Sequence, residues 1–163
     1  FRSNCSFMEY EEKCDFCMSQ LVIIKYREIL KILEENSNVI ILKIPIEKVK
    51  SEEERRKEEE EIKNCLIFKK LKPFFLESRL CREHGTIIKR KKSKKGYYMT
   101  DNWYFYKYDR NVRKILQEYP TIYSMADWID IYFISENKII LKTIAHEEIC
   151  YGTAKLFRSL KTQ

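Results

Sequence analysis

Glycine and proline are scarce in this chain, with three residues of each type among 163. These two residues make most of the sharp turns in globular proteins, because glycine adopts positive φ and proline fixes φ. The chain also has 44% apolar residues, which is enough to build a core. We therefore expect regular helices and strands joined by tight connections.

The first half of the chain shows a helical pattern, a strand pattern and a second helical pattern. Apolar residues recur near helical spacing from Leu21 to Leu33. The apolar, β-branched run Val39–Ile44 predicts a buried strand that Pro45 ends. Ser51 followed by Glu54 forms a capping box, which predicts an exposed helix near residues 51–63.

The second half alternates strand patterns with helix patterns. In chain order we expect a basic β-hairpin near 86–100, a turn at Asp101-Asn102, a strand over 103–108, a short helix capped by Asp109, a hairpin of strands 129–134 and 138–144, and a closing helix from Ala145. These elements predict an α+β fold in which three to five helices pack on an antiparallel sheet of four to six strands. We expect all of these elements to form a single domain over residues 1–163.

Charge is unevenly distributed along the chain, which carries a formal charge of +7. Seven glutamates fall between Glu52 and Glu61, whereas six of the seven positions from Lys89 to Lys95 are lysine or arginine. A localised basic patch attracts an anionic partner even when another surface is acidic. The acidic helix near 51–63 could meet a protein partner instead.

Aromatic residues follow the basic run directly, which favours a ligand that has both phosphates and rings. Alternation along 103–108 places Trp103 and Phe105 on one strand face and Tyr104, Tyr106 and Tyr108 on the other. We expect the first face to enter the core and the tyrosines to stay exposed for base stacking. The predicted residues for binding single-stranded RNA or DNA are Lys89, Arg90, Lys91, Lys92, Lys94, Lys95, Tyr97, Tyr104, Tyr106, Lys107 and Tyr108.

Two short pairs of residues have the spacing of zinc ligands. Cys14 and Cys17 form a C-x-x-C pair, and Cys81 and His84 form a C-x-x-H pair. Three thiolates and one imidazole suit tetrahedral zinc, so these four residues are a candidate structural zinc site. The alternative is that the cysteines are buried or bonded to one another and that His84 is an ordinary surface residue.

The six cysteines also permit three disulfides in a secreted protein. Asn4-Cys5-Ser6 matches the acceptor pattern for N-glycosylation. A secreted interaction module of the pathogen-effector type, braced by disulfides, is therefore the alternative to an intracellular nucleic-acid-binding domain. A third hypothesis is a small structural subunit of a larger assembly.

No catalytic signature stands out in the sequence. The chain has two histidines, neither in a recognisable motif, and its three glycines are too isolated to form a phosphate-binding loop. Asp127, Asp130 and Glu136 with Lys138 resemble the acid-acid-x-lysine arrangement of metal-dependent nucleases, but Glu136 falls in a predicted turn. No apolar run approaches the roughly 20 residues of a membrane-spanning helix. We therefore expect a non-catalytic protein without a membrane span.

Overall fold

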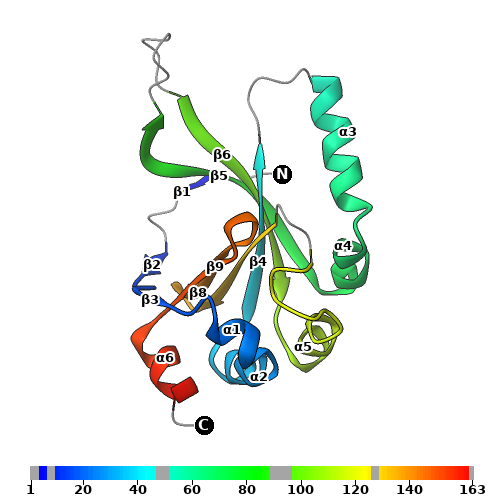
Figure 1. Cartoon of the computed structure of the whole chain (residues 1–163). Helices are drawn as coiled ribbons and strands as arrows, with labels where there is room; N and C mark the ends of the chain where they lie inside the picture. The colour runs from blue at the N-terminus through cyan, green and yellow to red at the C-terminus, as the bar shows by residue number, and fades with distance from the viewer. Residues whose placement is uncertain (1–3, 7–9, 47–51, 89–96, 126–128, 162–163) are drawn as a thin grey trace.

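A computed structural model of the chain describes residues 4–6, 10–46, 52–88, 97–125 and 129–161 (Figure 1). The helices are α1 (Leu21–Ile24), α2 (Tyr26–Asn36), α3 (Glu52–Lys63), α4 (Leu66–Leu71), α5 (Arg110–Leu116) and α6 (Ala154–Lys161), with 3-10 turns η2 (Lys72–Phe74) and η3 (Ala145–Glu147). The strands are β1 (Asn4–Ser6), β2 (Glu11–Glu12), β3 (Phe16–Cys17), β4 (Val39–Ile46), β5 (Phe75–Ile88), β6 (Tyr97–Lys107), β7 (Asp130–Ser135), β8 (Lys138–Ile144) and β9 (Ile149–Gly152).

All of these strands belong to one sheet, which confirms the predicted α+β class. The strand order is β1-β5-β6-β4-β7-β8-β9-β3, and β2 pairs with β8 outside this path. The β1–β5 and β2–β8 pairs are parallel, and the other pairs are antiparallel. The sheet has nine strands rather than four to six, because short segments near the N-terminus add to its edges.

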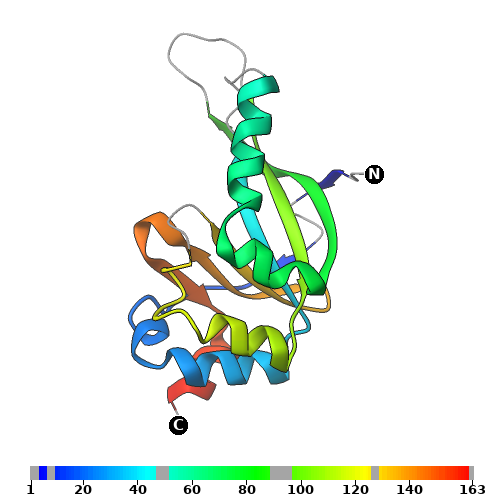
Figure 2. The same cartoon turned by 90° about the vertical axis from the view of Figure 1, so that its right-hand side faces the viewer.

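Helices cover one face of the sheet and bury the larger of two apolar clusters. This cluster joins Leu30 and Leu33 of α2 to Ile40 and Leu42 of β4, and it extends to Leu156 of α6. Figure 2 shows α3, α4 and α5 in front of the sheet. The amphipathic pattern from Leu21 to Leu33 correctly placed this face, although the structure divides that segment at Lys25, whose ammonium donates to the carbonyl of Leu160 at 2.8 Å.

The opposite face of the sheet buries a second, smaller cluster. Trp103, Phe105 and Tyr132 are at its centre, and the N-terminal segment contributes Cys14 and the half-buried Tyr10. Tyr10 lies 5.9 Å from Trp103 between ring centroids. Both faces of β6 are therefore buried over residues 102–106.

Three predicted boundaries were wrong, each because pairing across the sheet outweighed a local turn signal. β4 continues through Pro45, at a point where its ladder with β7 has already ended at Lys43 and a residue without an N–H is tolerated. β6 runs without a turn through Asp101-Asn102, since these residues pair with β5 and β4. The helix expected from Ala145 starts at Ala154, because β9 first pairs with β8.

Candidate functional site

The basic segment connects the two longest strands of the sheet. β5 and β6 pair as far as Ile88 and Tyr97. This pairing holds the two ends of the intervening segment next to each other. The predicted binding residues Lys89, Arg90, Lys91, Lys92, Lys94 and Lys95 lie outside the described residues, as does the side chain of Tyr97. Lys107, at the other end of β6, is exposed and lies 4.0 Å from the carboxylate of Asp109.

The three tyrosines expected at the surface are buried, so this part of the prediction was wrong. Tyr104, Tyr106 and Tyr108 are 7%, 3% and 3% exposed. Their strand lies between β5 and β4, and their face of the sheet is covered by helices. Phe68 of α4 packs edge-on against Tyr104 with 5.4 Å between ring centroids. Burial also raises the pKa of Tyr106 and Tyr108, so both phenols stay neutral.

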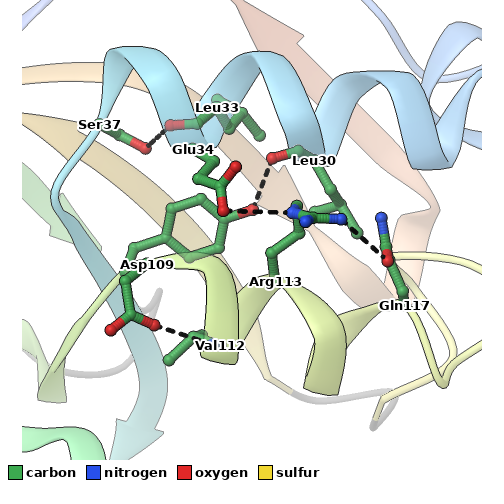
Figure 3. Close-up of polar contacts among 9 residues, drawn as sticks. Leu30, Leu33, Glu34, Ser37, Asp109, Val112, Arg113 and Gln117 are labelled. Atoms are coloured by element: carbon green, nitrogen blue, oxygen red, sulfur yellow. Dashed lines mark hydrogen bonds and ion pairs between the residues drawn. The ribbon is translucent and has the colours of Figure 1, made fainter.

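Polar contacts around Tyr108 explain why this ring points inward at the end of β6. Its hydroxyl donates to the carbonyl of Leu30 at 2.7 Å, which gives the buried phenol a partner inside α2. Asp109 then caps α5 by accepting from the N–H of Val112 at 3.0 Å, as the sequence predicted. Figure 3 shows this cap beside the ion pair between Arg113 and Glu34, which are 3.3 Å apart.

Cation–aromatic pairs on the second face of the sheet are a feature that sequence analysis missed. Arg79 lies over the ring of Phe105 at 5.0 Å, and Lys142 lies 5.9 Å from the ring of Tyr151. Lys142 also contacts Glu12 at 2.8 Å. These pairs join residues from different strands, so only the sheet register, not local spacing, could have revealed them. They accommodate charged side chains against apolar rings rather than leaving a free basic surface.

The four predicted zinc ligands fall on different parts of the sheet. Cys14 is buried and donates a hydrogen bond to the carbonyl of Ile139 at 3.3 Å, and burial raises the pKa of its thiol to about 12. Cys17 is in β3, whereas Cys81 is in β5, six positions away in strand order. The side chains of Cys81 and His84 lie outside the described residues. The residues that the structure describes contain no cluster of three metal-ligating side chains, and the zinc site stays a prediction.

The cysteines also bear on the disulfide hypothesis. Cys14, Cys17, Cys65 and Cys150 have free thiols. The structure therefore does not contain a framework of three disulfides. Cys17 is the exposed member of the group, and its hydrogen bond to the hydroxyl of Ser19 at 3.3 Å lowers the pKa of its thiol.

Within the described ranges, no helix is long and apolar enough to cross a membrane. No protein-family model, no curated protein and no solved structure matches this chain.

Proposed function

We propose that the β5–β6 hairpin is a non-catalytic binding element for single-stranded nucleic acid, and that it acts through phosphate contacts. The observation that carries the proposal is the pairing of Ile88 with Tyr97, which brackets a segment with six cationic residues. A paired ladder keeps the two ends of the segment adjacent, so its charges belong to one end of the hairpin. Neither zinc nor the buried tyrosines are needed for this function.

Electrostatics support a polyanionic partner. No aspartate or glutamate occurs between Thr86 and Thr100, so no acidic residue close in sequence neutralises the six cations. Each phosphate that a cation neutralises releases a condensed counterion, and this release provides most of the affinity in non-specific complexes. Dissociation constants of such complexes are about 10⁻⁴ to 10⁻⁶ M at physiological salt.

The burial of the tyrosines changes the expected mode of binding. Stacking on exposed aromatics is worth about 1–3 kcal/mol per base, and Tyr104, Tyr106 and Tyr108 cannot supply it from the core. Binding through phosphates alone is nearly independent of base sequence. We therefore expect similar affinities for oligouridylate and oligothymidylate of equal length.

The test compares two variants that lose the same number of positive charges. In the hairpin variant, Lys91, Lys92, Lys94 and Lys95 are replaced by glutamine. In the control variant, glutamine replaces four exposed lysines on other elements: Lys31, Lys69, Lys72 and Lys114. Fluorescence anisotropy with a labelled oligothymidylate of about 20 nucleotides measures the affinity of each protein.

We expect the hairpin variant to bind at least about 30-fold more weakly than the unmodified protein in low salt, because four phosphate contacts are lost. The control variant should lose less than about threefold, through the change in net charge alone. Equal losses in both variants would refute a localised site. No binding of the unmodified protein to any oligonucleotide would refute the function itself.

The exposed acidic side chains of α3 support a second candidate function, which is contact with a basic protein. Its exposed residues include Glu53, Glu54, Glu60 and Glu61. A solvent-exposed acidic helix attracts a basic surface through long-range electrostatics. Replacing these four glutamates by glutamine should abolish retention of the protein on an immobilised polylysine peptide. Unchanged retention of that variant would exclude α3 as the contact.

A further inference from the structure

A cavity of about 550 Å³ opens beside the start of helix α6. Four segments that are distant in sequence form its walls, within 11–16, 32–36, 135–140 and 153–159. Figure 1 shows two of these segments, α6 and β3, side by side. The volume is within the range of roughly 300–1,000 Å³ that is usual for small-molecule sites.

A β-bulge in β8 holds the start of α6 beside the cavity. Phe133 pairs with Leu141 and Ile134 pairs with Ile139, so Ile140 is an extra residue on β8. The carbonyl of Ile140 accepts a hydrogen bond from the N–H of Thr153 at 3.1 Å, immediately before α6. Bulges of this kind redirect side chains and are common next to functional sites. Here the bulge leaves Ile140 on the cavity wall.

The floor of the cavity is apolar. Ile32, Ile140 and Leu156 line it and belong to the larger apolar cluster; Ile32 and Leu156 are 7% and 4% exposed, and Ile140 is half-buried. Phe16, which is 39% exposed, stands at its side and stacks on Phe157 with 5.0 Å between ring centroids. An apolar ligand group placed here would leave water and contact buried side chains, which is the main source of affinity for small molecules.

The rim of the cavity is cationic. Its charged residues are Lys13, Lys138, Lys155, Arg158, Glu11 and Asp15. The carboxylate of Glu11 already contacts the ammonium of Lys13 at 3.0 Å, so lysine and arginine outweigh the remaining acidic charge. The α6 helix adds the positive end of its dipole, since its first turn borders the cavity. A single negative charge at the rim is therefore favoured.

We propose that this cavity binds a small amphipathic monoanion, with an apolar body on the isoleucine floor and a carboxylate or sulfonate head at the lysine rim. This binding function goes beyond the proposed nucleic-acid contact. It uses different residues, and it does not depend on the charges between β5 and β6.

The test uses the fluorescent anion 1-anilinonaphthalene-8-sulfonate, which combines apolar rings with one sulfonate. We expect saturable binding at one site on the folded protein. Exchange of Lys138 and Lys155 for glutamate should raise the dissociation constant at least about tenfold, because two rim charges are reversed. Both residues are exposed, so the fold should persist, as near-ultraviolet circular dichroism will show.

The matched control carries Lys31→Glu and Lys114→Glu, which are exposed and lie outside the cavity lining. Its dissociation constant should stay within about twofold of that of the unmodified protein. Equal weakening in both variants, or binding without saturation, would overturn the proposal.

Competition experiments then test the contributions of the apolar body and the charged head of the ligand separately. Octanoate should displace the probe, and octanol should need at least about tenfold higher concentration, because it lacks the charge. Equal potency of octanol would overturn the assignment to an anion. The hairpin variant with four glutamines should bind the probe normally, which keeps this result distinct from that of the nucleic-acid experiment.

Discussion

The hairpin segment and the cavity beside α6 are both cationic, but their charges come together in different ways. In the hairpin, six cations are neighbours in sequence between Lys89 and Lys95. At the cavity, Lys13, Lys138 and Lys155 come from three distant segments, and the fold brings them to one rim. The first region therefore suits an extended polyanion, and the second suits one small anion with an apolar body.

The difference shows that cationic residues adjacent in sequence do not by themselves form a small-molecule site, whereas cationic residues brought together by the fold can border one. Aromatic residues next to the hairpin run looked like part of its binding surface. The structure places Tyr104, Tyr106 and Tyr108 in the core of the molecule instead, while the cavity combines charge with an apolar floor. The cavity therefore has both properties at one place.

The largest expected change in stability concerns Tyr106 at the base of the hairpin, and it tests whether this ring is a core residue or a binding residue. Because Tyr106 is 3% exposed, Tyr106→Ala should lower the free energy of unfolding by about 3–5 kcal/mol. Lys107→Ala, at the exposed neighbour, should change it by less than about 0.5 kcal/mol. Urea unfolding measures both values. A Tyr106→Ala protein that keeps its stability but no longer binds oligonucleotide would show that Tyr106 belongs to the binding surface.

The sequence predicted the fold well where periodicity agreed with tertiary packing. The alternation from Trp103 to Tyr108 correctly assigned opposite faces of β6, and Asp109 correctly began α5. The burial of the tyrosines was not predictable, because it depends on α4 and the other helices that cover their face of the sheet. The cavity was not predictable either, since the bulge at Ile140 depends on pairing between β7 and β8.

Alkaline pH provides a second test, because Cys14 anchors the segment that forms one wall of the cavity. Burial raises the pKa of this thiol from about 9 to about 12. Below pH 9 the thiol is neutral in both states. Above pH 9 the unfolded chain loses the proton first, so Cys14 removes about 1.4 kcal/mol of stability per pH unit up to about pH 12.

The measurement is urea unfolding of the unmodified protein and of Cys14→Ala at about pH 8 and about pH 10.5, a window that spans the ionisation of an unburied thiol. The stability gap between the two proteins should narrow as the pH rises. Cys17→Ala is the control, because Cys17 is exposed and its thiol pKa is lowered rather than raised. A gap independent of pH would contradict the burial of Cys14 against β8.

A smaller effect is expected at the cap of α5, which packs beside the base of the hairpin. Asp109→Ala removes the acceptor for the N–H of Val112 and should cost about 1 kcal/mol. Asp109→Asn keeps a capping oxygen and should cost less. Thermal unfolding of the two variants checks this order. Neither variant should change the affinity for oligonucleotide, and a large loss of affinity would show that the base of the hairpin contributes to binding.

The most direct test of phosphate binding at the hairpin is the salt dependence of affinity for single-stranded oligothymidylate. Each phosphate contact contributes about −0.7 to the slope of log affinity against log salt concentration. The slope should therefore be about 3 units shallower when Lys91, Lys92, Lys94 and Lys95 are glutamine than in the unmodified protein. Identical slopes in the two proteins would contradict the account.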